Sequence, residues 1–345
     1  MQHEVKSALE LLDNDGRIIV EGWARHPYWQ YNRNKIRASA LRIKEWDYYY
    51  ILSSDRAFGI TLTMSDLGYA GMFAICFLDF KKRYFYQTDA LSILPLGKTG
   101  FPFGSDEGRV FFGDKNLELN FVYAGGVRTL SFKAPGIIDA DGNSGLEGAV
   151  ILTQTPDHES MNIATSWAEN RKAFYYNRKV NCMQAAGGFT IGSKRYEFDP
   201  ARDMGGLDWG RGRWTYKNRW YWGSASGYLD KVPFGWNIGY GFSDRSPASE
   251  NMLFYAHKAH KLEEVSFVMD KDNYLKPWRF ESSDKRFEMD FKPLIDRSSS
   301  VVLGPIKSIQ HQVFGEFSGK AVLDDGTELK VENFLGFAED VLNHW

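Results

Sequence analysis

Asp208 is the acidic residue whose neighbours most suggest chemistry. Trp209 follows it directly, and Arg211 and Arg213 come shortly after. A carboxylate can accept or release a proton during a reaction, and nearby guanidinium groups favour its charged form. We therefore interpret Asp208 as a base or electrostatic stabiliser, and the two arginines as groups that face an anion or orient the carboxylate. A buried ion pair that fixes the junction between two lobes would use the same residues, so both interpretations stay open.

Glu250 follows the same segment after a short loop and is the candidate proton donor, with Asn251 beside it. His257 and His260 come soon afterwards, but no third ligand stands at a recognised spacing. We therefore expect exposed histidines and no metal site. The sequence also lacks GxSxG and phosphate-loop motifs, and it has no GxGxxG followed by a helix. We expect chemistry that uses no cofactor.

Glycine and aromatic residues alternate in the segment that follows Asp208. From residue 234 to residue 242 every even position is large and apolar, and every odd position is Gly or Asn237. A strand places these two sets on opposite faces. Repeated glycine in a strand indicates that a backbone, a ring or a ligand comes close to the bare face. We predict a sheltered hollow beside Asp208 that binds a small molecule; tight packing against a neighbouring ring is the alternative.

Indole rings and amide side chains form the expected wall of this ligand site. Trp220 and Trp222 would share one face of a strand with Ser224 and Ser226, and such a mixture suits a partly apolar or sugar-like molecule. A stretch around residue 46 would line the opposite wall, with ordinary packing as the alternative. The residues expected to contact the ligand are Trp209, Trp214, Trp220, Trp222, Trp236, Asn237, Asn251, Trp46 and Asp47.

Composition excludes several other classes of protein. The 345 residues carry a net charge of -2 without long basic runs, which argues against a nucleic-acid partner. No apolar run is long enough to span a bilayer, and no signal peptide is recognisable, so we expect a cytoplasmic protein. Cys76 and Cys182 have no CxxC partner and are expected to be buried thiols. Aromatic residues make up 16% of the chain, including 11 Trp, which suits ligand walls as well as cores.

Period-two alternation predicts a mostly β protein of two antiparallel, calycin- or lipocalin-like lobes, each a barrel or sandwich, with few helices. In residues 287–292 apolar and charged side chains alternate without a break, as in a half-buried strand. Short Gly-containing turns between such runs favour hairpins over βαβ units. We expect an N-terminal lobe over residues 1–203 and a C-terminal lobe over 204–345. Helices are expected only at residues 3–12 and at 333–342, the latter capped by Asn333.

Longer motifs in the sequence resemble a bacterial family, the domain of unknown function numbered 2804. They are Gly22-Trp23-Ala24-Arg25, Lys44-Glu45-Trp46-Asp47-Tyr48-Tyr49, Tyr176-Asn177-Arg178-Lys179, the block from Asp208 to Trp222, Glu250-Asn251, Phe314-Gly315 and Gly336-Phe337-Ala338-Glu339-Asp340. This resemblance covers nearly the whole chain and implies no particular activity.

A shorter pattern, Asp208, Trp209-Gly210 and then Trp220-Tyr221-Trp222, is similar to the lipocalin-like group of hydroxyneurosporene hydratase, tocopherol cyclase and Diels-Alderase. That resemblance implies two β-barrel-like lobes that enclose a hydrophobic substrate, with acid/base groups that promote hydration or cyclisation. In that group other residues usually separate the Asp from the Trp-Gly pair, whereas here they are adjacent. The fold therefore transfers better than the catalytic assignment.

These observations together predict an enzyme that binds a neutral, partly apolar small molecule between two lobes. Its acid/base chemistry would be a hydration, elimination, isomerisation or cyclisation, with Asp208 and Glu250 as the reacting groups. A non-catalytic carrier of lipids or other hydrophobic ligands is the first alternative. A carbohydrate-active hydrolase or lyase is the second, because Trp faces and paired carboxylates also suit sugars.

Overall fold

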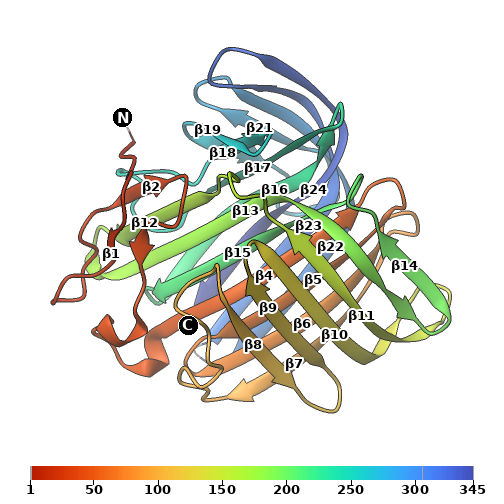
Figure 1. Cartoon of the computed structure of the whole chain (residues 1–345), viewed down its shortest axis with the longest axis horizontal. Helices are drawn as coiled ribbons and strands as arrows, with labels where there is room; N and C mark the ends of the chain where they lie inside the picture. Colours follow the sequence, from red (N-terminus) through yellow and green to blue (C-terminus); the bar gives the residue numbers. More distant parts are fainter. Residues whose placement is uncertain (1, 305, 345) are drawn as a thin grey trace.

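The computed structural model describes residues 2–304 and 306–344. Two large antiparallel sheets form two lobes, which confirms the expected two-lobed β architecture (Figure 1). The first sheet has 13 strands in the order β7-β6-β5-β4-β15-β13-β11-β10-β9-β8, with β12, β14 and β2 beside this path. The second has nine, in the order β19-β18-β17-β16-β24-β23-β22-β21-β20.

The strands of the first sheet are β2 (Gly22–Ala24), β4 (Ile43–Ser53), β5 (Phe58–Asp66), β6 (Ala70–Asp79), β7 (Tyr84–Ile93), β8 (Gly108–Gly113), β9 (Glu118–Ala124), β10 (Val127–Ile138), β11 (Ser144–Thr153), β12 (Met161–Trp167), β13 (Asn170–Ile191), β14 (Lys194–Phe198) and β15 (Met204–Arg213). Those of the second are β16 (Lys217–Leu229), β17 (Val232–Tyr240), β18 (Met252–Tyr255), β19 (Lys258–Lys261), β20 (Val265–Val268), β21 (Trp278–Ser282), β22 (Phe287–Leu303), β23 (Ile306–Val322) and β24 (Glu328–His344). A parallel pair, β1 (Leu9–Glu10) with β3 (Trp29–Gln30), and two short 3-10 helices, η1 (Arg33–Lys35) and η2 (Ala40–Arg42), complete the described chain.

Alternation along each strand decides which side chains face which lobe. In β4, Tyr49 and Ile51 belong to the core inside the first lobe. Tyr48 and Tyr50 point the other way and pack with residues of the second lobe, including Phe337. We call these two sides of the first sheet its interior face and its inter-lobe face. Both faces are buried, so successive residues of β4 have unlike surroundings.

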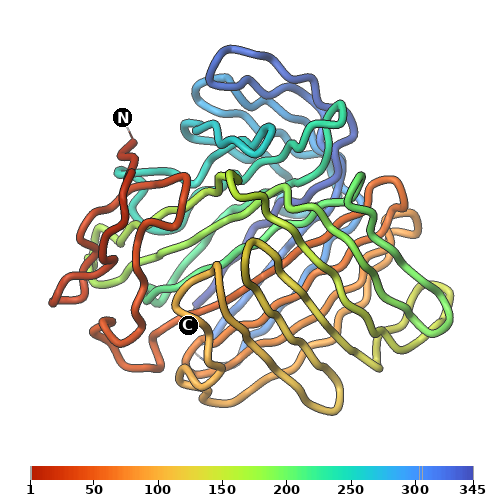
Figure 2. Tube along the Cα trace, viewed as in Figure 1, coloured from red at the N-terminus to blue at the C-terminus, as the bar shows by residue number. Residues whose placement is uncertain are grey.

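Polar contacts as well as rings join the two lobes. The Tyr50 hydroxyl lies 2.8 Å from both Ser224 Oγ and Ser226 Oγ of β16. Figure 2 shows the N-terminal residues in red at the edge of the molecule, where the His3 amide donates to the Pro247 carbonyl at 2.9 Å. The N-terminal segment thus also contacts the second lobe.

The two predicted α-helices are wrong. Residues 333–342 lie inside β24, where residues on both sides of the strand are buried between β16 and β23. Asn333 is a left-handed residue (φ 49°) at a register shift in this strand, and it caps no helix. In the N-terminal segment, Leu9 and Glu10 form β1. Apolar residues at helical spacing were misleading because a strand covered on both faces also carries apolar residues at such positions.

The chain passes from the first sheet to the second between Arg213 and Lys217, some residues after the expected boundary at 203/204. β15 lies between β13 and β4, so the Asp208 motif belongs to the first sheet and the Trp-rich strands β16 and β17 to the second. The segment singled out in the sequence therefore spans both lobes. Within the described ranges, no helix has the length and apolar character needed to cross a membrane.

Three further expectations concern single side chains. Cys76 and Cys182 are free and buried, as expected. His257 and His260, expected to be exposed, are partly buried, and His257 lies 4.8 Å from His158 between ring centroids. Among the described residues no cluster of three or more metal-ligating side chains includes them.

Candidate functional site between the lobes

Asp208 is positioned by the register of three neighbouring strands. It lies opposite Lys179 of β13 on one side and Tyr48 of β4 on the other. Directly opposed residues share a face of the sheet, so all three point toward the second lobe. Lys179 Nζ lies 2.9 Å from Asp208 Oδ2, and Asn177 Nδ2 donates to Oδ1 at 2.6 Å. The carboxylate is therefore ion-paired and hydrogen-bonded on the inter-lobe face.

Lys179 is the cation of a buried group that also contains Glu250 and Glu339. Its ammonium interacts electrostatically with both glutamates, each of which also interacts with Asp208. Lys179 Nζ lies 3.7 Å from the centre of the Trp222 ring, where a cation–π contact stabilises the charge. We call Asp208, Lys179, Glu250 and Glu339 the acid–lysine cluster. Three carboxyl groups around one ammonium cannot all be ionised without strong repulsion.

Glu250 lies at the second lobe's side of this cluster. Burial is the largest influence and raises the pKa of its carboxyl, while Lys179 and a hydrogen bond with Asn237 oppose the shift. Asn237 Nδ2 also donates to the Glu250 carbonyl at 2.8 Å, and Asn237 Oδ1 accepts from Trp222 Nε1 at 2.6 Å. The amide of Asn237 thus links Glu250 to the indole beneath Lys179.

Glu339 is brought to the cluster by β24, where it lies opposite Trp222 of β16 and Gln312 of β23. Trp220 Nε1 donates to Oε1 at 2.9 Å, and Gln312 Nε2 donates to Oε2 at 3.1 Å. Burial raises the pKa of Glu339 to about 7, despite the opposing influence of the Trp220 bond and of Lys179. A carboxyl with this pKa exchanges its proton near neutral pH, as general acid/base catalysis requires.

Aromatic rings lie beside the cluster, and Trp220 contacts Glu339 directly. Trp46 stacks on Tyr175 with centroids 6.3 Å apart and meets Trp214 edge-on at 5.1 Å. Trp214 and Trp220 are 6.1 Å apart, and Trp46 and Trp220 are both only half-buried. Asp208, Glu250 and Glu339 keep 8%, 9% and 8% of their surface exposed. Water therefore reaches each carboxyl only slightly, in a setting where electrostatic interactions are strong.

The bare face of β17 is filled by protein rather than left open. A Cβ at Gly235 would come within 2.9 Å of Cys182 Sγ in the first lobe, and one at Gly239 within 2.8 Å of Glu250 Oε1. The alternative of close packing therefore holds at these two glycines. Their absent side chains let a thiol and a carboxyl group approach the strand.

Several residues proposed for the site in the sequence lie in it. Asp208, Glu250, Trp222 and Asn237 form the cluster and its first contacts, and Trp220, Trp214 and Trp46 form its wall. Asn251 is adjacent to Glu250, but its side chain forms hydrogen bonds with the backbone. Its Oδ1 accepts from Gly239 N at 2.7 Å, and its Nδ2 donates to the Glu263 carbonyl at 2.9 Å.

Other proposed residues point away from the cluster. Trp209 and Arg211 occupy the interior face of the first lobe, and Arg211 NH1 lies 3.1 Å from Asp47 Oδ1 on that face. Asp208 therefore pairs with Lys179 and not with Arg211, because side chains three positions apart in a strand face opposite ways. Arg213, at the strand end, is partly buried and forms no ion pair with a described residue. Trp236 packs inside the second lobe, on the face of β17 opposite Asn237.

Comparison with known protein families identifies the family of this chain. The sequence matches the family described as Domain of unknown function (DUF2804) over residues 2–345. The chain belongs to the DUF2804 family. No curated protein matches the sequence.

Crystal structures of CghA share the fold of this DUF2804 protein at low sequence identity. The crystal structure of CghA with Sch210972 is 12% identical, with a TM-score of 0.55, over 88% of this chain and 89% of that one. A second crystal structure of CghA is 11% identical, with a TM-score of 0.53, over 88% of both chains. Kievitone hydratase from Nectria haematococca is 11% identical, with a TM-score of 0.48, over 88% of both. The CghA structures confirm the likeness in fold to the lipocalin-like group.

Two residues of the cluster, and Asn177 that bonds to it, were missed as site residues in the sequence. Lys179 and Asn177 lie within the motif Tyr176-Asn177-Arg178-Lys179, and Glu339 lies within Gly336-Phe337-Ala338-Glu339-Asp340. Both motifs had contributed to recognition of the DUF2804 family, but nothing in their local pattern indicated which face they occupy or which strand lies opposite.

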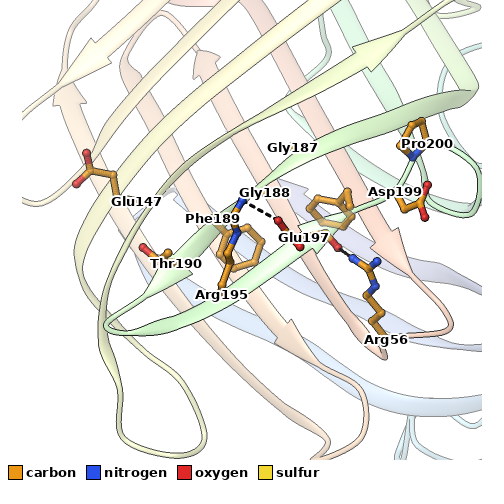
Figure 3. A pocket seen from close by; sticks show the side chains of 11 residues that line it. Arg56, Glu147, Gly187, Gly188, Phe189, Thr190, Arg195, Glu197, Asp199 and Pro200 are labelled. Atoms are coloured by element: carbon orange, nitrogen blue, oxygen red, sulfur yellow. Dashed lines mark hydrogen bonds and ion pairs between the residues drawn. The ribbon is translucent and has the colours of Figure 1, made fainter.

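A separate surface cavity of about 480 Å³ lies beside β13 and β14 (Figure 3). Gly187, Gly188 and Phe189 line it together with Arg195 and Glu197. It shares no residue with the acid–lysine cluster. We therefore assign it no part in the proposed site.

Glu339→Gln is expected to change the pH dependence of stability. The folded protein keeps the Glu339 proton that the unfolded chain loses between pH 4.5 and about 7, so this residue makes stability fall as pH rises through that range. The shift corresponds to roughly 3 kcal/mol. Urea unfolding at about pH 5 and about pH 8 should show this decline in the native protein and a much smaller one in the variant. Glu316→Gln, on the adjacent strand β23, is the control; an unchanged decline in Glu339→Gln would contradict the assignment.

Proposed function

We propose that this DUF2804 protein is an enzyme that binds a neutral, partly apolar small molecule between its lobes and transforms it by acid/base chemistry of its own side chains. The reaction would be a hydration, elimination, isomerisation or cyclisation. The observation that carries this proposal is the acid–lysine cluster. It combines an ion-paired aspartate with two carboxyl groups of raised pKa inside an aromatic wall. Such pairs of unlike titratable groups are typical of acid/base sites.

The surroundings of each carboxyl group suggest its role. Asp208 lies 2.9 Å from the Lys179 ammonium and accepts a hydrogen bond from Asn177 at 2.6 Å, and it would act as the base or stabilise a developing positive charge. Burial favours the protonated form of Glu250 and Glu339, and these would donate the proton. Lys179 would lower the energy of a negative charge that develops beside it.

The charge of the site favours a neutral substrate. Lys179 balances Asp208, and a protonated glutamate adds no charge, so neither an anion nor a cation gains a net counter-ion there. The rings of Trp46, Trp214 and Trp220 offer apolar contact area. The fold of CghA, crystallised with Sch210972, accommodates a small molecule, which supports the same class of ligand here.

Native mass spectrometry of freshly purified protein tests the binding part of this proposal. We expect a bound mass that organic solvent extracts and that is identified as a neutral, partly apolar molecule. Asp208→Asn should retain this molecule unconverted, whereas a pure carrier would release the same molecule from the native protein and the variant. A charged or fully hydrophilic ligand, such as an unsubstituted oligosaccharide, would contradict the proposed substrate class.

A further inference from the structure

A second group of buried polar side chains lies on the interior face of the first lobe, opposite the acid–lysine cluster. Arg128 of β10 lies directly across from Tyr123 of β9. Both interact electrostatically with Asp47 and Tyr49 of β4. All four residues are at least nine-tenths buried. We call them the interior polar cluster; it shares no residue with the site between the lobes.

Unlike the other buried arginines of this lobe, Arg128 has no carboxylate at ion-pair distance among the described residues; Asp47 and Asp106 attract it only from farther away. Arg211 pairs with Asp47 at 3.1 Å, and Arg178 pairs with Asp106 at 2.6 Å. Arg128 is 3% exposed, donates from NH1 to the Ser105 carbonyl at 2.7 Å, and forms no ion pair within residues 2–304 and 306–344. A buried charge whose counter-ions are not in direct contact is only partly compensated. The Arg128 guanidinium can therefore still pair directly with an anion.

Unused hydrogen-bond donors accompany this charge. Arg128 Nε, the Tyr123 hydroxyl and Trp209 Nε1 are buried and have no hydrogen-bond partner among the described residues. The Arg128 guanidinium lies 5.5 Å from the centre of the Tyr123 ring, so its charge and the phenol belong to one small volume. Buried donors are nearly always paired in folded proteins. Several donors beside a cation match a carboxylate, which offers two acceptor oxygens.

Apolar side chains of the interior face lie between this cluster and the edge of the lobe. Asp47 lies opposite Met64, and Met64 lies opposite Phe73, so all three side chains point to the interior face. Phe73 stacks on Phe112 of β8 at 3.7 Å, where the edge strands β7 and β8 curl toward each other (Figure 1). A cavity of about 330 Å³ at this edge is lined by Phe73, Phe112, Ile93 and Leu94. Ile93 is 87% exposed.

We propose that the first lobe contains a second ligand site, for a monocarboxylate with an apolar chain. The carboxylate binds Arg128 and the Tyr123 hydroxyl, and the chain extends along Met64 and Phe73 toward the opening between β7 and β8. This site is independent of the proposed reaction between the lobes.

Titration calorimetry with sodium octanoate and with 1-octanol tests this site. We expect octanoate to bind and the neutral alcohol of equal length to bind far more weakly, because only the carboxylate can pair with Arg128. Arg128→Met keeps the length of the side chain and removes the charge. It should weaken octanoate binding at least about 30-fold, as expected for loss of a buried charged partner. Without octanoate the variant should still fold and lose only the stability of the hydrogen bond to the Ser105 carbonyl, because no direct ion pair is lost.

Three further variants test whether octanoate binds in the interior polar cluster or elsewhere on the protein. Tyr123→Phe removes only an unpartnered hydroxyl, so it should fold normally and bind octanoate several-fold more weakly. If Arg128→Met does not fold, the octanoate affinity of Tyr123→Phe tests the proposed site. Arg109→Met on β8 and Asp208→Asn should leave octanoate binding unchanged. Equal binding of octanol, undiminished octanoate binding by Arg128→Met or by Tyr123→Phe, or no octanoate binding at all would overturn the proposal.

Discussion

Replacing Asp208 by Asn should lower turnover about 100- to 10,000-fold, as loss of a general base or of a fixed charge typically does. Asn is nearly isosteric with Asp and can still accept the hydrogen bond that Asn177 Nδ2 donates. It cannot remove a proton or offset the charge of Lys179. The loss should therefore appear in kcat, with the substrate still bound. Steady-state kinetics on the substrate identified from the purified protein measures this effect.

Two related variants make the result specific to the acid–lysine cluster. Glu250→Gln should lower turnover by a comparable factor and remove the alkaline limb of the pH profile, on which the native protein loses the proton of its donor. Asp244→Asn changes a carboxylate at the end of the same segment that pairs with Arg171 at 2.8 Å, outside the cluster, and should keep full activity. If both Asp208→Asn and Glu250→Gln retain native turnover, neither residue has the proposed catalytic role.

Arg211→Met should destabilise the protein by about 3–5 kcal/mol, the usual result of removing one partner of a buried ion pair. Arg211 is fully buried, lies 3.1 Å from Asp47 Oδ1 and 3.9 Å from Glu45 Oε1, and donates to the Trp46 carbonyl at 2.8 Å. Without its guanidinium, Asp47 loses its ion-pair partner inside the first lobe. Urea unfolding, followed by tryptophan fluorescence, gives the change in the free energy of unfolding.

Arg213→Met is the matched comparison, since this arginine lies two residues along the same strand and has no ion pair with a described residue. Its effect should stay within about 1 kcal/mol. The double variant Arg211→Met/Asp47→Leu should regain part of the lost stability, because removing both charges leaves no unpaired group. Equal stability of Arg211→Met and the native protein would show that Arg211 is not the structural counter-ion of Asp47.

The residues of the sequence motif around Asp208 have two different roles. Residues of β15 that face the second lobe contribute to the proposed reaction, and those that face the first lobe contribute to its interior. The motif looks continuous in the sequence, but a strand separates its members by about the thickness of a sheet. Adjacent residues of one motif can therefore belong to different sites.

Local sequence determined much of the architecture. Alternation predicted the strands and the opposite faces of Phe234–Ile238, with Trp236 on the apolar face and Asn237 on the bare one, and the structure places them in this way. The period of side-chain direction is a property of the extended backbone itself, so it can be seen without knowledge of the neighbours. The same local view failed at residues 333–342, because a strand buried on both faces loses its alternation.

Only the tertiary structure decided which groups meet at the site. Lys179, Asp208, Glu250 and Glu339 come from separate parts of the chain, and the two sheets bring them together. The partner of a strand residue depends on which distant strand pairs with it and in which register, and both are set by the burial of whole sheets. For this reason the sequence indicated Asp208 as a base or stabiliser and Glu250 as a proton donor. The lysine that balances them, and the third carboxyl group with a pKa of about 7, became visible only when the lobes were assembled.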